Sequence, residues 1–109
     1  MDDVGIDIVS NDYIERNLTV SFIKHILSEE EMVRYNTCND KVRFVAGRFA
    51  AKEAIIKCMK RLQLTDMTRI TITTGEYGEP EVHFDDYEIK VSISHNSDYT
   101  VAIALYHSK

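Results

Sequence analysis

The sequence contains no long hydrophobic run, and no stretch approaches the roughly 20 apolar residues that a transmembrane helix requires. Its opening, Met1, Asp2 and Asp3, also lacks the basic and then apolar segment of a secretory signal. Taken together, these absences predict a soluble cytoplasmic protein.

Positive charge is scarce, with 13 Lys and Arg against 18 Asp and Glu, and the net charge is -5. A chain with this balance has no overall basic field to attract nucleic acid or an anionic membrane. We therefore expect no nucleic-acid partner and no membrane partner. Any anionic ligand must be met by local cations or by a bound metal ion.

Cysteine is rare as well, and the two cysteines, Cys38 and Cys58, form no C-x-x-C motif. We interpret both as reduced thiols, with Cys58 in the core, rather than as metal ligands or redox centres. His25, His83 and His107 do not recur at ligand spacing, which argues against a zinc site. The four glycines and the only proline form no phosphate-binding fingerprint.

What is present is a globular composition of 109 residues, 44% hydrophobic and 28% charged. Such a chain has enough apolar side chains to fold, and its length is that of one domain. No internal repeat, low-complexity tract or linker divides it. We expect residues 1–109 to form a single domain.

Hydrophobic periodicity predicts an α+β fold, with an N-terminal strand, short helices and one long central helix packed on a mainly antiparallel sheet. The first strand spans residues 3–9, and its alternation places two isoleucines on one face and Asp7 on the other. Between residues 10 and 36 we expect two or three short helices, one of them begun by a capping box of Ser28 and Glu31.

The long helix is expected from about Asp40 to Leu62, as the spine of the domain. After it the apolar period changes to 2, which predicts four strands in an antiparallel meander. Gly75–Pro80 supplies a turn, and His95–Asp98 is a loop suited to a hairpin. The apolar positions that mark the four strands are Ile70 and Ile72; Val82 and Phe84; Ile89, Val91 and Ile93; and Val101, Ile103 and Leu105.

The segment RFAAKEAIIK, residues 48–57, places Glu53 and Lys57 one helical turn apart. On a helical wheel their side chains lie about 40° apart, away from the main apolar stripe. Ala46 and Ala50 on the same face are small enough to leave space for a ligand. The alternative interpretation is an ordinary surface ion pair worth about 0.2–0.5 kcal/mol.

Asp7 offers Glu53 a chemical partner from another part of the chain. Two carboxylates held close together repel each other unless a cation lies between them. A hard cation held by one or two carboxylates and by phosphate oxygens describes a Mg²⁺ site. The residues alone favour this interpretation no more than a simple helix-capping role for Asp7.

Two further places carry candidate ligand contacts. Arg48 lies about 140° from Glu53 on the same wheel, so it need not serve the same ligand atoms. His95 and Asn96 belong to the segment SISHNS, where a strand ends and a turn begins. Such a loop can hold phosphate, although Ser and Asn more often hydrogen-bond within their own turn.

Taken together, three blocks resemble the holo-acyl-carrier-protein synthases, the small 4'-phosphopantetheinyl transferases. GIDIV at residues 5–9 is similar to the family's first block, AGRFAAKEAIIK from Ala46 to its second, and VSISHNSDYTVAIA from Val91 to its last. The family's lysine, glutamate and later lysine match KEAIIK at residues 52–57. The resemblance covers nearly the whole chain, in the expected order.

The resemblance implies transfer of the phosphopantetheine arm of coenzyme A to a serine of apo acyl carrier protein, with release of adenosine 3',5'-bisphosphate, in support of fatty acid and lipid biosynthesis. It implies Mg²⁺ held by Asp7 and Glu53, with Lys57 as a phosphate contact near the reacting centre. The serine must also lose its proton, and the sequence does not identify the base: a metal-activated water and Glu53 itself are the two candidates. The candidate catalytic residues are Asp7, Glu53 and Lys57, and the candidate coenzyme A contacts are Arg48, Lys57, His95 and Asn96.

The resemblance also implies a homotrimer with active sites between subunits, in which Arg48 would serve a neighbour's site. The sequence departs from the family in three respects. Tyr13 stands where members often carry an arginine, Tyr77–Pro80 reads YGEP instead of N-G-x-P, and the first helices carry few basic residues. Carrier docking is therefore expected to use apolar contacts such as Phe22 and Ile23, or to be weaker and less sensitive to salt.

Two other classes of function are alternatives: a non-catalytic coenzyme A or nucleotide-binding module of the same fold, and a structural oligomerisation domain. The joint presence of Asp7, Glu53 and Lys57 argues against the binding module, because a binder has no need for two acids that bridge a metal ion. An oligomerisation domain predicts no stabilisation by Mg²⁺ or coenzyme A.

Overall fold

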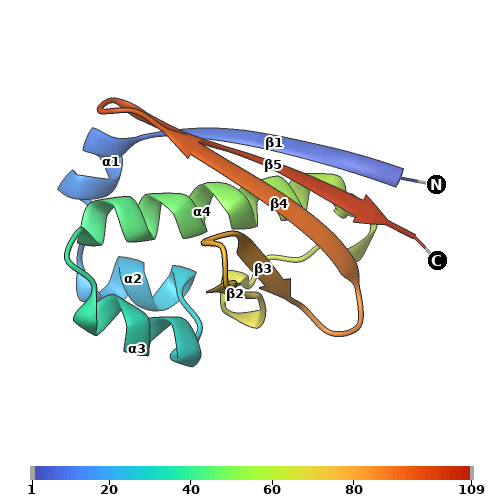
Figure 1. Ribbon diagram of the computed structural model, residues 1–109, viewed down its shortest axis with the longest axis horizontal. Helices are drawn as coiled ribbons and strands as arrows, with labels where there is room; N and C mark the ends of the chain where they lie inside the picture. Colours follow the sequence, from blue (N-terminus) through green and yellow to red (C-terminus); the bar gives the residue numbers. More distant parts are fainter. Residues whose placement is uncertain (1, 109) are drawn as a thin grey trace.

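α4 (Lys41–Cys58) runs through the middle of the protein, seen in a computed structural model that describes residues 2–108 (Figure 1). A three-stranded sheet lies on one side of α4, and two of the shorter helices and a small hairpin lie on the other. The other elements are β1 (Asp2–Ser10), α1 (Asn11–Arg16), α2 (Val20–Ile26), α3 (Glu29–Thr37), the 3-10 turns η1 (Lys60–Leu62) and η2 (Met67–Arg69), β2 (Thr71–Thr74), β3 (Pro80–His83), β4 (Glu88–His95) and β5 (Tyr99–His107).

Each α-helix begins at a polar side chain that accepts a hydrogen bond from its first turn. The predicted capping box is present at α3, where Ser28 and Glu31 exchange hydrogen bonds. α4 begins after Asp40, as predicted, but ends at Cys58 rather than near Leu62. The chain leaves the α-helix there because the next turn tightens into η1 and Gln63 takes a left-handed conformation, with φ of 48°.

The strands form two antiparallel sheets, so the predicted α+β class is confirmed while the four-strand meander is wrong. β4 and β5 make one hairpin, β1 pairs with the far side of β5, and β2 pairs only with β3. β1 occupies that edge because it aligns with β5 along its whole length, and this register places Asp7 opposite Ala102. In the part of the chain that is described, no helix is long and apolar enough to cross a membrane.

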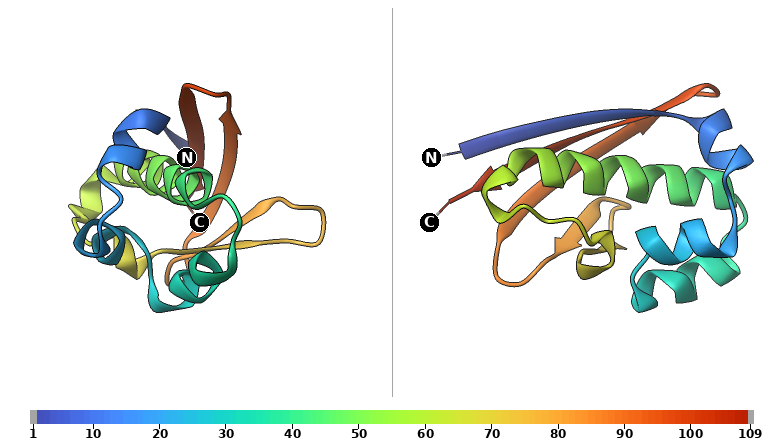
Figure 2. Two further views of the ribbon diagram at one scale, coloured as in Figure 1. Left: turned by 90° about the vertical axis from the view of Figure 1, so that its left-hand side faces the viewer. Right: turned by 180° about the vertical axis from the view of Figure 1, so that it is seen from behind.

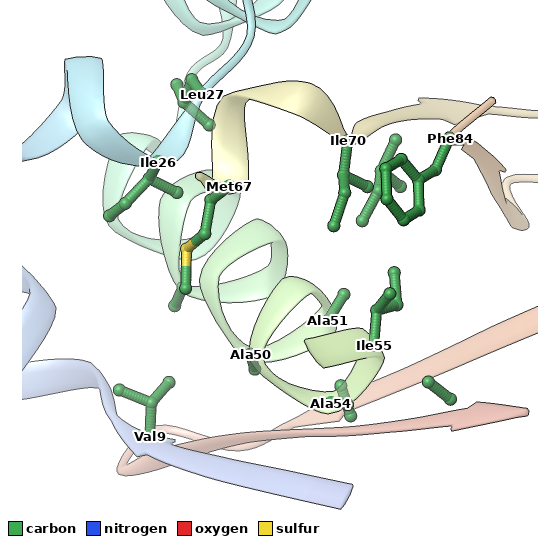
Figure 3. Close-up of a cluster of buried hydrophobic side chains, with 14 of the residues drawn as sticks. Val9, Ile26, Leu27, Ala50, Ala51, Ala54, Ile55, Met67, Ile70 and Phe84 are labelled. Atoms are coloured by element: carbon green, nitrogen blue, oxygen red, sulfur yellow. The ribbon is translucent and has the colours of Figure 1, made fainter. Parts of the chain in front are cut away.

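α4 is buried around most of its circumference by these layers (Figure 3). Ala46 and Ala50 are fully buried, so the expectation that they leave space for a ligand is wrong. Their small side chains instead let the helix and the sheet pack closely. On the β1 side, Gly5 also allows this close packing, because a Cβ atom there would overlap the Ala54 carbonyl oxygen.

The outer face of β1 and β5 carries apolar side chains that are exposed. Val4, Ile6 and Ile8 are 59–63% exposed, and Ile103 and Leu105 on β5 are cross-strand partners of Ile6 and Val4. We call these five residues the apolar sheet face, and the strands that carry them run along the outside of the molecule (Figure 2). Asp7 points away from this face, as the alternation predicts.

Candidate active site

Asp7 and Lys57 meet across the interface between β1 and α4. The Lys57 ammonium donates to Asp7 Oδ1 at 3.0 Å and to the Ile6 carbonyl oxygen at 3.1 Å. The ion pair of Lys57 is therefore with Asp7, and the interpretation of Glu53 and Lys57 as a simple surface pair is wrong. The capping role considered for Asp7 is also wrong, because Ser10 caps α1.

Glu53 lies one turn before Lys57 and is half-buried beside the same strand. Burial raises the pKa of the Glu53 carboxyl, the neighbouring Asp7 charge raises it further, and Lys57 acts in the opposite direction. Glu53 is one turn from Lys57 on α4 and Lys57 bonds Asp7, so the fold brings the three side chains into one neighbourhood, which we call the carboxylate half-site.

The donor set of the carboxylate half-site fits a hard cation that also binds substrate oxygens. Two carboxylates with phosphate oxygens are a common way to hold Mg²⁺. Within residues 2–108, no group of three or more His, Cys, Asp or Glu residues is placed to hold a metal ion alone. A cation here would therefore depend on Asp7, Glu53 and its substrate together.

A cavity of about 460 Å³ opens beside Lys57, at the C-terminal end of α4. Lys60 and Arg61 add two cations to its lining, and Tyr87 and Tyr106 add aromatic surface. In a chain of net charge -5, this is a local concentration of positive charge next to the carboxylate half-site. It supplies the local cations that an anionic ligand requires.

Arg48 faces a different hollow from the carboxylate half-site. It lines a groove of about 350 Å³ together with His95 and the turn residues Gly78 and Pro80. The guanidinium lies 4.2 Å over the Phe44 ring, and burial lowers the pKa of Arg48. We call this groove the arginine half-site, and its separation from Glu53 agrees with the helical wheel.

Asn96, a predicted coenzyme A contact, uses its side chain within its own turn. Its Oδ1 accepts hydrogen bonds from the backbone N–H groups of Asp98 and Tyr99, both at 2.8 Å. Asn96 lines a neighbouring hollow with His95 rather than the groove that holds Arg48. The structure thus brings His95 to Arg48 and leaves the Asn96 amide in the turn.

The aromatic residues of the first helices are partly packed into the protein. Ile23 is 5% exposed, so the expectation that it contacts a carrier protein is wrong. Phe22 lies between Tyr13 and Phe49, with ring centroids 6.3 and 6.1 Å away. Tyr13, which stands where the family often has arginine, is the more exposed of the three rings.

Sequence reasoning missed the role of the buried pair Glu31 and Lys52. Lys52 and Glu53 form the first two residues of the KEAIIK segment, which we call the KE motif. Lys52 is nevertheless fully buried, and it is bonded to Glu31 and two carbonyl oxygens. A lysine among the alanines of a central helix is a signal that an acid must be buried nearby. The capping box had already marked Glu31, but not its second role.

Comparison with known proteins places this geometry in a family. The model of the 4'-phosphopantetheinyl transferase superfamily matches residues 3–104. A holo-[acyl-carrier-protein] synthase of Oceanobacillus iheyensis is 38% identical, over 91% of this chain and 90% of that protein. One of Mycoplasma capricolum is 40% identical, over 96% of this chain and 94% of that protein.

Solved structures of holo-acyl-carrier-protein synthases share the fold. The Bacillus anthracis enzyme in complex with CoA (3',5'-ADP) superposes with a TM-score of 0.88 and 30% identity, covering 98% of this chain and 96% of that one. The Helicobacter pylori enzyme in complex with coenzyme A has a TM-score of 0.82 and 27% identity, covering 95% and 99%. The chain therefore belongs to the 4'-phosphopantetheinyl transferase superfamily and, within it, to the holo-[acyl-carrier-protein] synthases.

Proposed function

We propose that this protein transfers the 4'-phosphopantetheine group of coenzyme A to a serine of apo acyl carrier protein, in a Mg²⁺-dependent reaction. The products are holo acyl carrier protein and adenosine 3',5'-bisphosphate. The observation that carries the proposal is the carboxylate half-site, in which Asp7 and Glu53 lie with Lys57 in a chain of this family. Coenzyme A complexes of its relatives support the choice of substrate.

Asp7 and Glu53 would hold Mg²⁺, which when bound supplies positive charge to the pyrophosphate of coenzyme A. Lys57 supports the same task directly. Two of its three N–H groups are used by Asp7 and the Ile6 carbonyl, so a third can reach a phosphate oxygen. Its side chain is 48% exposed and therefore open to a ligand.

The reaction asks the protein mainly to position charges. The carrier serine gives up its proton to Glu53 or to a water molecule as its oxygen attacks the β-phosphorus, and the bond to the adenosine bisphosphate leaving group breaks. Lys57 stabilises the negative charge that grows on the leaving phosphate, since its ammonium is already fixed by Asp7. His95 and Arg48 would hold the nucleotide portion in the arginine half-site, which makes the attack effectively intramolecular.

The proposed assembly is a homotrimer whose active sites lie between copies. The apolar sheet face supports a second copy as its occupant, because five large apolar side chains on two adjacent strands are otherwise exposed to water. The two half-sites lie in separate hollows of one chain. In the assembly, the carboxylate half-site of one copy would be completed by the arginine half-site of a neighbouring copy. We place the reaction in the cytoplasm and in fatty acid and lipid biosynthesis, where holo carriers hold acyl groups.

The deciding experiment is the intact mass of apo acyl carrier protein after incubation with this protein, coenzyme A and Mg²⁺. A gain of one phosphopantetheine is expected, with an equal amount of adenosine bisphosphate. The gain should disappear with a chelator or with Glu53→Ala, and persist with Glu29→Ala, an exposed carboxylate outside both half-sites. A binding module would give stabilisation by coenzyme A without any gain in mass, and an oligomerisation domain would give neither.

A further inference from the structure

Glu31 and Lys52 form a buried ion pair directly behind Arg48. The Glu31 side chain is 1% exposed, and both of its oxygens are used. Oε1 accepts from the Lys52 ammonium and from the Ser28 backbone N–H at 2.9 Å, and Oε2 accepts from the Ile72 backbone N–H at 2.9 Å. A capping carboxylate is usually exposed, so its complete burial here calls for a second task.

Lys52 is anchored as completely as its partner. Its ammonium donates to the Ile26 carbonyl at 2.7 Å, to the Met67 carbonyl at 3.1 Å and to Glu31. All three of its N–H groups are therefore used, and none is left for a ligand. Lys52 thus fixes the place of the Glu31 carboxylate rather than binding substrate itself.

Arg48 and Glu31 hold opposite ends of the same residue of β2. Glu31 accepts the N–H of Ile72, while Arg48 Nη2 donates to the carbonyl oxygen of Ile72 at 3.0 Å. β2 continues into the turn that brings Gly78 and Pro80 to the wall of the groove beside Arg48. The position of this wall thus depends on the same two side chains.

The charges explain why Glu31 is needed between two cations. Arg48 Nε lies 3.8 Å from Glu31 Oε2 and, within residues 2–108, is the buried side-chain atom that lacks a hydrogen-bond partner. Burial lowers the pKa of both Arg48 and Lys52, and Arg48 lowers that of Lys52 further, whereas the Glu31 charge acts in the opposite direction on both cations. Without the carboxylate, Arg48 would be pushed away from Lys52 and out of its present orientation.

We infer that Glu31 and Lys52 are a positioning pair for Arg48, which keep its guanidinium arranged for coenzyme A in the arginine half-site. This rests on the proposed function, since it assumes that Arg48 contacts coenzyme A. The pair touches no substrate, and its effect on binding passes through Arg48. The KE motif then has two separate tasks, with Glu53 serving one half-site and Lys52 the other.

The test compares Glu31→Gln with the charge-free double variant Glu31→Gln, Lys52→Met. Breaking a buried pair by removing one charge destabilises strongly, whereas removing both is often tolerated. The double variant is therefore expected to fold and to retain kcat within about twofold, while its KM for coenzyme A rises about tenfold. Glu30→Gln, an exposed neighbour on α3, is the matched control and should change neither constant.

A double-mutant cycle with Arg48→Ala separates positioning from general stability. If the pair acts through Arg48, its effect on KM disappears in the Arg48→Ala background. Full additivity, or an unchanged KM in a folded double variant, would overturn the inference. The same cycle can be measured without turnover, by calorimetric binding of coenzyme A to each variant. The comparison therefore still decides the inference if the proposed transferase activity proves wrong. A wild type that does not bind coenzyme A refutes the inference.

Discussion

Glu53 links the chemistry of the site to the stability of the protein at the scale of one residue. Its pKa is raised by burial and then by Asp7, so the folded state holds the Glu53 proton more tightly than the unfolded chain does. The free energy of unfolding therefore falls as the pH rises from the unfolded pKa through the folded one. Without divalent metal, Glu53→Gln should melt a few degrees above wild type at pH 7, and this difference should vanish below about pH 4.

Added Mg²⁺ should reverse that order, because the ion stabilises only a chain that can bind it. With coenzyme A present to complete the site, we expect Mg²⁺ to raise the melting temperature of the wild type and to leave that of Glu53→Gln unchanged. Glu29→Gln, whose carboxylate lies in neither half-site, should behave as wild type throughout. Equal stabilisation of both proteins by Mg²⁺ would remove Glu53 from the metal site.

Individual residues also show what the sequence can and cannot reveal. Asp7, Glu53 and Lys57 were singled out by the family resemblance, because the residues alone left a surface pair and a helix cap open, and their roles in the site stay predictions. The wheel also separated Arg48 from Glu53 correctly. A helical wheel gives the direction of each side chain around one helix, but it does not show which elements pack against each side of that helix. Lys52 was therefore not recognised as buried, and Ala46 was placed on an open face.

At the scale of elements, the close contact of β1 with α4 is what brings Asp7 to Glu53, and Gly5 permits it. A side chain at Gly5 would overlap the Ala54 carbonyl oxygen and bring its Cβ to 2.8 Å from the Cys58 nitrogen. Gly5→Val should therefore lower the free energy of unfolding by about 1–3 kcal/mol or more and abolish the mass gain of the carrier, because β1 must move away from α4. Urea unfolding and the intact-mass assay measure the two effects.

Gly47 on α4 provides the contrasting substitution. A Cβ there would meet only methyl groups of Ile93, at an ordinary 3.9 Å. Gly47→Ala should raise the free energy of unfolding by about 0.5–1 kcal/mol, since glycine within a helix is costly. If Gly5→Val were as stable as wild type, the close approach of β1 and α4 would not be what holds the carboxylate half-site together.

The existence and type of most elements were predictable because they depend on local periodicity and on caps such as Ser28 and Asp40. The sheet order was not predictable in the same way. β1 pairs with β5 from the opposite end of the chain, and nothing in the local pattern of either strand specifies that partner. The meander was predicted from sequence order alone, which fails when a distant strand takes the edge of the sheet.

At the scale of the whole molecule, the apolar sheet face should decide the oligomeric state. Ile6→Glu places a charge in the middle of this face and should convert the proposed trimer to monomers in sedimentation, with loss of transferase activity. Val33→Glu is the matched control, because Val33 is 68% exposed on α3, away from the sheet. A trimeric and active Ile6→Glu variant would show that copies meet elsewhere.

The two half-sites make a further prediction that only an assembly with shared sites can fulfil. Glu53→Ala damages the carboxylate half-site and Arg48→Ala the arginine half-site, so each variant alone should have a strongly reduced kcat/KM for coenzyme A. In trimers formed by co-expression in equal amounts, a complete site arises where an Arg48→Ala copy supplies the carboxylate half-site and a Glu53→Ala copy supplies the arginine half-site. Random assembly yields this in about a quarter of sites, so the mixture should regain about a quarter of the wild-type kcat/KM for coenzyme A. If both half-sites acted within one copy, the mixture would show no more than the average of the separate variants.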